Sequence, residues 1–537
     1  MSIPNFYVPR SQQRGISLSG KVVEHTCPAI THDQFKGPNR QRYLQPHLEA
    51  LVANERTIKP KTLGNIDRAI SGNNINYKAL QRARQGIIAS MEDGPMTNSA
   101  RKIKPFLDSV RASAFVDFSR EDSESPHFER AFVLPHACVN AFLHSPQLLT
   151  FDACHFKSQT VGHILGASFL DASNHIVIMA WGVSAGNECK ETWSMFFDFL
   201  RQSVLAHSNV DIGFLTSIAD RGKGLVPAYS EVFPSGHLYH CIQHLAENLK
   251  SRFTVSIEKA FRILPHINDR SVFREIIRDK IQSQGAIGIQ AAEYISSLDT
   301  RLWTVFDAPP GRPRFGVKTS NTMESVWGRM LEERELDHLG FLYAVWRDVG
   351  EKFYERSQAV NLHPRFTDHW CGKFAVELER SRSYVVSQLA EDEAVVDHAN
   401  VVSRSSYLVN LAESSCSCLL WQDLQLPCRH AIAFLRFKQI DPETRICRAF
   451  SLESYRQAYT GRLNGIALAQ LEPDDTLPPR NQPEPEERGP GRPSKRKRGV
   501  KRTRQDEQKQ EETRALHRQV AEENEAGRGA IVVNRHC

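Results

Sequence analysis

The chain has 537 residues, of which 24% are charged, and a formal net charge of +6 at pH 7. At about 150 residues per domain this length predicts three or four domains, and so mild a net charge predicts no partner by itself. Because no run of about 18 apolar residues is present and the first residues lack an apolar secretory segment, we expect no membrane span and a reducing compartment, where the 11 cysteines are free thiols or metal ligands.

The first part of the chain divides into two predicted regions. Residues 1–48 contain scattered Pro, Gly and Ser and predict no regular element. Residues 49–146 are predicted to be a helical region, because segments such as "NINYKALQRARQGIIASM" place apolar residues at helical spacing. That segment also carries Lys78, Arg82 and Arg84. Such a basic helix either contacts DNA phosphates or is only a solvated surface.

Residues 147–335 read as an α/β domain. Three apolar segments with polar breaks predict successive strands: "QLLTFDACHF", "TVGHILGASFLDAS" and "HIVIMAWGVSA". A helix over 190–204 follows, with Trp193, Phe196, Phe197 and Leu200 on one buried face. A fourth strand, a short helix, a fifth strand and another helix come next. Three strands, a helix and then strand–helix–strand is the order of an RNase H-like fold, here with a helical insertion at about 250–315.

Three acidic residues stand out by their positions. We expect Asp152 to end the first strand and Asp220 to end the fourth, which lies beside the first in this fold. Glu324 lies in "TSNTMESVWGRMLEER", a helix that can face both. Carboxylates at such positions hold Mg²⁺ or Mn²⁺ for phosphoryl chemistry. Taken singly, an Asp at a strand end is most often a turn former, and a Glu on a helix is most often a surface group.

A second cluster lies in "CSCLLWQDLQLPCRH", after a predicted helical region at 336–399. The pair Cys416 and Cys418 is followed by nine residues and then by Cys428 and His430. Alternating residues before and after the first pair predict a hairpin, and "CRHAIAFLRFKQI" predicts a helix. Three thiolates and an imidazole suit a closed tetrahedral zinc site. The alternative is a buried cysteine pair with an unrelated Cys and His. We predict a small ββα zinc finger within residues 400–465.

Residues 466–537 are predicted to form a disordered tail. Seven prolines lie between Pro473 and Pro493, and nine Arg or Lys lie in the 17 residues from Arg488 to Arg504. This composition cannot bury enough apolar surface to fold alone. The candidate DNA-binding residues of the tail are Arg488, Gly491, Arg492, Pro493, Lys495, Arg496, Lys497 and Arg498. The Gly-Arg-Pro core resembles an AT-hook, which fits the minor groove of A/T-rich DNA, and the last four residues resemble a nuclear-localisation patch. The alternative is a solubilising charged tail.

The zinc-ligand spacing resembles the SWIM-type zinc finger. The sequence further resembles the Mutator-like element (MULE) transposases and the related far-red-impaired-response proteins. The block "SIADRGKGLVPAYSEVFPSGHLYHCIQHLAENL" is the most specific part of the likeness, and "FDACHFK" and "SNTMESVW" resemble two further motifs of the family. The resemblance implies catalytic roles for Asp152, Asp220 and Glu324. It also places the family's Cys-x-x-His at Cys241 and His244, for which we favour a structural or catalytic-support role over metal binding.

The sequence therefore predicts a multidomain α+β protein with an RNase H-like core, and the resemblance implies a DDE-type DNA transposase. In this family His25 and Cys27 would be the remnant of an N-terminal zinc-binding DNA module; an unbound surface pair is the alternative. The implied cofactors are structural Zn²⁺ and catalytic Mg²⁺ or Mn²⁺. The implied partners are DNA, as element ends and target, and further copies of the chain, in the nucleus, with no membrane and no small-molecule substrate. The alternative function is a domesticated or inactive transposase-derived regulatory protein that binds zinc and DNA.

Overall fold

A computed structural model describes residues 99–476, with gaps at 121–127, 158–159, 223, 360–362 and 400–405. It also describes two short paired strands, β1 (Ile16–Leu18) and β2 (Lys21–Val23), and isolated helical positions at 62, 63, 65 and 80. The chain divides into two units, Met1–Gln482 and Pro483–Cys537, and every described residue belongs to the first. None of the helices in these ranges has the length and apolar character needed to cross a membrane.

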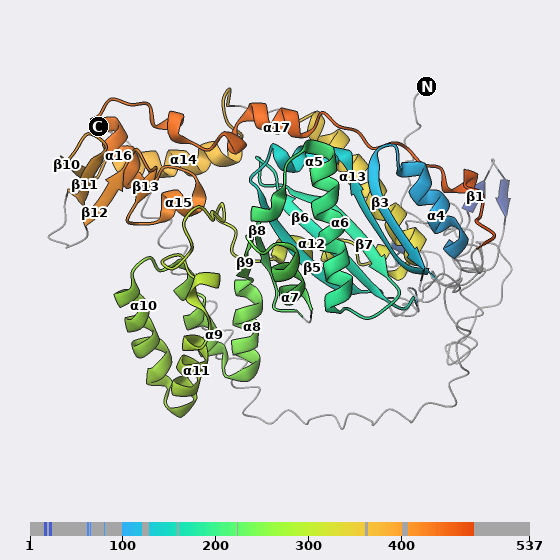
Figure 1. Cartoon of the computed structure of the whole chain (residues 1–537), viewed down its shortest axis with the longest axis horizontal. Coiled ribbons are helices and arrows are strands. Elements are labelled where there is room, and N and C mark those ends of the chain that lie inside the picture. Colours follow the sequence, from blue (N-terminus) through green and yellow to red (C-terminus); the bar gives the residue numbers. More distant parts are fainter. Residues whose placement is uncertain are drawn as a thin grey trace. The chain divides into compact units, whose positions relative to one another are not determined.

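A mixed seven-stranded sheet carries the largest core (Figure 1). Its strand order is β3-β4-β7-β6-β5-β8-β9. The bounds are β3 (Ala114–Arg120), β4 (Phe128–Pro135), β5 (Leu148–His155), β6 (His163–Leu170), β7 (Ile176–Ser184), β8 (Thr216–Ala219) and β9 (His237–His240). Strands β5, β6 and β7 pair antiparallel, while β8 lies parallel to β5 and β9 parallel to β8. The sheet therefore contains the five predicted strands in the predicted sequence order.

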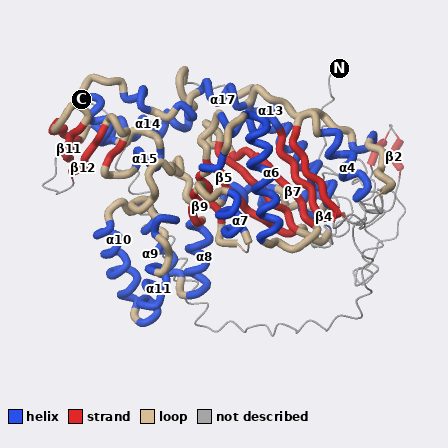
Figure 2. Tube along the Cα trace, viewed as in Figure 1, coloured by secondary structure: helices blue, strands red, loops and turns tan. Residues whose placement is uncertain are grey.

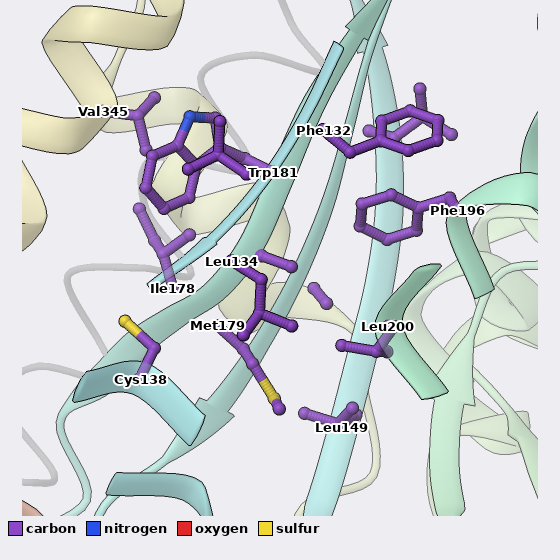
Figure 3. Packing of buried hydrophobic residues seen from close by; sticks show 14 of the residues in the cluster. Phe132, Leu134, Cys138, Leu149, Ile178, Met179, Trp181, Phe196, Leu200 and Val345 are labelled. Carbon is purple, nitrogen blue, oxygen red and sulfur yellow. The ribbon is translucent and has the colours of Figure 1, made fainter. Parts of the chain in front are cut away.

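Helices cover both faces of this sheet because its strands are apolar on both sides. On one face packs α6 (Lys190–Ser208), whose predicted apolar stripe is fully buried. On the other lie α12 (Asn321–Arg329) and α13 (His338–Ser357). Figure 3 shows Phe196 beside Phe132 on the α6 side and Val345 beside Trp181 on the opposite side. The connecting helix between β8 and β9 is α7 (Leu225–Val232).

The region predicted to be helical before the core is only partly so. Helices α4 (Ser99–Val110) and α5 (His136–Leu143) flank β3 and β4, which extend the main sheet past β7. The prediction of a helical region up to 146 is thus wrong for residues 114–120 and 128–135. These segments, "AFVDFSR" and "FERAFVLP", are rich in Phe and Val, which favour strands.

The helical insertion has a core of its own, and it begins at Ile242 rather than near 250. It consists of α8 (Ile242–Arg252), α9 (Val255–Phe261), α10 (Arg270–Ile276), a π-helical turn (Ile277–Ile281) and α11 (Ala286–Ser296). Figure 2 shows this part of the trace as helices and loops. The fully buried Trp303 packs against Phe261 and Phe273, with ring centroids 5.1 Å and 5.8 Å away.

A second, four-stranded sheet lies in the C-terminal part of the described chain. Its strands are β10 (Tyr384–Gln388), β11 (Glu393–His398), β12 (Ser406–Asn410) and β13 (Ser415–Cys416), in sequence order. The prediction of helices over all of 336–399 is therefore wrong for β10 and β11, which follow α14 (Asp368–Ser381). β10 pairs with β11, and β11 pairs with β12 of the predicted hairpin. Helices α15 (Leu420–Leu424), α16 (Arg429–Phe437) and α17 (Leu452–Ala458) complete this part.

Short 3-10 turns connect these elements, at Ile212–Phe214, Leu264–His266, Gln282–Gln284, Thr300–Leu302, Glu333–Glu335, Pro442–Arg445, Arg448–Phe450 and Leu468–Gln470. The last of these lies inside the segment predicted to be a disordered tail. Ile466, Leu468 and Leu471 pack against the main core. The start of the tail at 466 is therefore placed too early, because these aliphatic side chains find an apolar surface to cover.

Candidate functional site

Asp152 lies on the face of β5 that α12 covers. The strand continues beyond it to His155, so the prediction that Asp152 ends the strand is wrong. The reason is that β6 pairs with β5 along this whole stretch, with Gly166 opposite Asp152 and His163 opposite His155. Asp152 is therefore held by a paired backbone on one side rather than by a loop.

Asp220 follows β8 directly, as predicted. Strand β8 is parallel to β5, and Ala219 stands opposite Phe151 in the register. Asp152 comes directly after Phe151, and Asp220 comes directly after Ala219. The strand pairing therefore brings the two acids side by side. The backbone N–H of Arg221 donates a hydrogen bond to the Asp220 carboxylate at 2.6 Å.

Glu324 reaches the same place from α12, and Gly166 allows that helix to approach closely. A Cβ atom at position 166 would lie 2.5 Å from the Trp327 ring and 2.6 Å from the Met323 methyl group. A glycine in the middle of a strand often marks such a close approach. A hydroxyl contact also joins the helix to the sheet, since Thr322 lies 2.6 Å from Thr150. Gly166 and Thr322 were not predicted, although the strand-interior glycine was a usable signal.

Cys241 and His244, at the start of α8, complete the cluster. The His244 ring lies 3.3 Å from the Glu324 carboxylate and 3.9 Å from that of Asp220. The Cys241 thiol is buried and accepts a hydrogen bond from the Ser320 backbone N–H at 3.2 Å. One ligand atom each from Cys241, His244 and Glu324 lies within 4.8 Å of the other two. The structure thus brings all five predicted residues of this site together.

The environment of the cluster raises the pKa of both Asp152 and His244. Burial, together with the negative charges of Glu324 and Asp220, raises the pKa of Asp152 to about 7. A hydrogen bond with Cys241 and the two nearby carboxylates raise the pKa of His244 to about 9, although burial opposes this. His244 is therefore a cation at neutral pH, placed between two carboxylates.

The three carboxylates do not converge as closely as the four residues of the Cys/His cluster at 416–430. In the described ranges, the three acids do not form a group whose ligand atoms all lie within 4.8 Å of one another. The Glu324 Oε1 atom is buried and lacks a hydrogen-bond donor, since the approach of His244 does not have hydrogen-bond geometry. A buried carboxylate oxygen without a donor, beside two further carboxylates, is the donor set that a hard divalent ion prefers.

The second candidate site is the cluster of Cys416, Cys418, Cys428 and His430. Their ligand atoms all lie within 4.8 Å of one another. Cys416 is the last residue of β13 and Cys418 follows it, while Cys428 caps α16 and His430 lies in its first turn. A hairpin strand thus supplies Cys416 and a helix start supplies Cys428 and His430, as predicted. Cys418 lies beyond the strand, and the segment after it, predicted to belong to the hairpin, forms α15 (Leu420–Leu424).

Distances within this cluster fit zinc. The Cys416 and Cys428 sulfurs lie 3.6 Å and 3.8 Å from Nδ1 of His430. A tetrahedral ion with sulfur at about 2.3 Å and nitrogen at about 2.0–2.1 Å would place these atoms about 3.6 Å apart. Hydrogen bonds with Cys416 and Cys428 hold the pKa of the Cys418 thiol far below its usual value. The residues present therefore support a structural Zn²⁺ site.

Side chains that sequence reasoning missed hold these ligands in place. Tyr407 stacks on the His430 ring with centroids 3.8 Å apart, and Tyr384 meets the same ring edge-on at 4.7 Å. The half-buried Arg429 guanidinium donates to both carboxylate oxygens of Glu377 on α14, at 2.9 Å and 3.0 Å. This bidentate pair fixes the start of α16, where two of the ligands lie.

Other predicted residues lie outside the described residues. These are the eight candidate DNA-binding residues of the tail from Arg488 to Arg498, the N-terminal His25 and Cys27, and the basic residues Lys78, Arg82 and Arg84.

Two family models match the chain. The MULE transposase domain matches residues 148–248, which include Asp152, Asp220, Cys241 and His244. The SWIM zinc finger matches residues 407–437, which include all four zinc ligands. No curated protein matches the chain. Both matches support a MULE-type transposase, and the second agrees with the Cys₃His cluster.

Proposed function

We propose that this chain, with its MULE transposase domain and SWIM zinc finger, is a DDE-type transposase that cleaves DNA strands and joins 3′-hydroxyls to target DNA. The observation that carries the proposal is the meeting of Asp152, Asp220 and Glu324 around His244. The three acids come from two neighbouring strands and a helix that are far apart in sequence, so the fold has gathered them at a cost in electrostatic repulsion.

The strand order supports an RNase H-like core. Strands β7, β6 and β5 are antiparallel neighbours, and β8 and β9 follow on the other side of β5 in parallel. In such a core the first and fourth strands lie side by side, which is where Asp152 and Asp220 stand. Strands β3 and β4 extend this arrangement at the edge beyond β7.

Asp152, Asp220 and Glu324 would hold Mg²⁺ or Mn²⁺. When bound, such ions lower the pKa of an attacking water or hydroxyl and stabilise the charge of the leaving oxygen. The protein's own part is to fix the carboxylates on paired strands and on a helix packed tightly at Gly166. His244 lies between Asp220 and Glu324, and its positive charge offsets part of theirs.

DNA, as element ends and target, is the proposed partner, and we expect several copies of the chain to act together in the nucleus. The basic tail beyond residue 488 supports DNA binding by its composition, because cationic side chains release counterions from phosphates. The zinc finger has its own supporting contacts, from Tyr407 to His430 and from Arg429 to Glu377.

The proposal is tested by incubating the purified full-length protein with supercoiled plasmid DNA. We expect nicked and linear products in the presence of Mn²⁺ or Mg²⁺, and none when EDTA replaces the divalent ion. The zinc content should be measured before and after, so that loss of the finger is not mistaken for loss of the catalytic ion. Nicking that proceeds unchanged in EDTA contradicts the proposal.

A further inference from the structure

A basic cluster lies next to Asp220 and joins the sheet to the helical insertion. Arg221 follows the acid directly, and its guanidinium donates a hydrogen bond at 2.8 Å to the hydroxyl of Tyr294. Tyr294 lies on α11, in the insertion. The insertion therefore reaches the immediate neighbour of a proposed metal ligand.

A second arginine shares the same tyrosine. Arg252 is the last residue of α8, and its guanidinium carbon lies 4.9 Å from the centroid of the Tyr294 ring. It also lies 5.4 Å from the ring of Phe253, whose centroid is 6.1 Å from that of Tyr294. Two aromatic rings thus hold Arg252 by cation–π contacts, while the hydroxyl of one ring holds Arg221.

Neither guanidinium has a carboxylate partner within 4.0 Å in the part of the chain that the structure describes. Three other arginines of this region do have one, since Arg262 pairs with Glu258, Arg278 with Asp279 and Arg301 with Asp299. Both arginines contact the same tyrosine, and no carboxylate of the described residues within 4.0 Å pairs with either, so an anion bound there would meet two cationic side chains.

We propose that Arg221 and Arg252, positioned by Tyr294, bind a backbone phosphate of DNA beside the Asp220 carboxylate. This inference rests on the proposed function and deepens it, because it gives the helical insertion a direct part in holding the substrate. A guanidinium matches a phosphate with two parallel hydrogen bonds, which fixes orientation as well as adding affinity. A phosphate held by Arg221 lies one residue from the carboxylates, so the cluster would set the register of the strand to be cut.

The test compares Arg221→Ala, Arg252→Ala and Tyr294→Phe with the wild-type full-length protein. Arg274→Ala is the matched control, because Arg274 is an exposed arginine of α10 in the same insertion. The probe is a fluorescein-labelled DNA duplex of arbitrary sequence, and its affinity is measured by anisotropy over a range of salt concentrations. Circular dichroism melts establish that each variant is folded, and plasmid nicking in Mn²⁺ is measured on the same samples.

We expect Arg221→Ala and Arg252→Ala to reduce the slope of log affinity against log salt by about 0.9 for a lost phosphate contact. Tyr294→Phe keeps the ring that Arg252 covers and removes one hydrogen bond, so it should weaken binding about threefold to tenfold. Arg274→Ala should leave the slope unchanged. If the arginine variants keep the wild-type slope and affinity while wild-type protein nicks plasmid, the inference is wrong and the proposed function stands. If the wild-type protein nicks nothing, the proposed function fails whatever the slopes are.

Discussion

Replacing Asp220 with Asn should abolish strand cleavage while DNA binding persists. The substitution keeps the shape of the side chain and removes the charge that a divalent ion needs. Loss of one carboxylate ligand should cost about 4 kcal/mol of transition-state stabilisation, which is roughly a thousandfold in rate. The measurement is plasmid nicking in Mn²⁺ together with anisotropy of a labelled duplex, for the wild-type and variant proteins side by side.

Two control variants test whether the effect is specific to the proposed metal ligands. Asp198→Asn makes the same chemical change at an exposed position of α6, and it should cleave at the wild-type rate. Glu324→Gln should behave like Asp220→Asn, whereas Glu332→Gln, eight residues further along the chain, should not. A normal cleavage rate in Asp220→Asn would show that these carboxylates do not carry the reaction.

Removal of zinc should unfold the second sheet and α16 while the main sheet stays folded. The four ligands join a hairpin to a helix start, and the apolar core around them is small. Zinc binding in comparable fingers is worth about 10–16 kcal/mol, most of which is folding free energy. Full-length protein should contain one zinc per chain, and Cys428→Ser should contain none. Hydrogen exchange measured by mass spectrometry should then show lost protection in β10–β12 and α16 and retained protection in α6.

A cysteine outside the cluster provides the control for this experiment. Cys447 is a partly buried free thiol that does not belong to the ligand set. Cys447→Ser should therefore keep both its zinc and its protection in α16. Unchanged protection of α16 in zinc-free protein would contradict a structural role for the ion.

The site residues that could be predicted from the sequence lie in short segments with a recognisable pattern. The zinc ligands lie within 15 residues, so their spacing alone indicated a shared metal site. Asp152 and Asp220 each follow an apolar segment that predicts a strand. The order of these strands in the chain predicts that the two acids are neighbours. Glu324 is harder to predict from the sequence pattern, because the helical insertion separates its helix from the strands of the sheet. Its assignment rested on the resemblance to a family.

The parts that were missed depend on contacts between distant segments. Strands β3 and β4 precede the core in sequence, and only their pairing with β7 shows that they belong to its sheet. Gly166 allows close packing only because Trp327 and Met323 of α12 lie against it, and the sequence does not show that contact. Arg221 and Tyr294 are 73 residues apart, and neither residue alone indicates the other. No spacing rule predicts such contacts, because they are fixed by packing in three dimensions.

Mn²⁺ binding followed by electron paramagnetic resonance tests whether Asp152, Asp220 and Glu324 together hold a divalent ion. Zinc-loaded full-length protein is titrated with Mn²⁺, and the loss of the signal of the free hydrated ion gives the amount bound. We expect wild-type protein and Asp198→Asn to bind Mn²⁺ alike, and Asp152→Asn, Asp220→Asn and Glu324→Gln each to bind markedly less. Equal binding by all five proteins would contradict this expectation, because the ion would then be held by other residues.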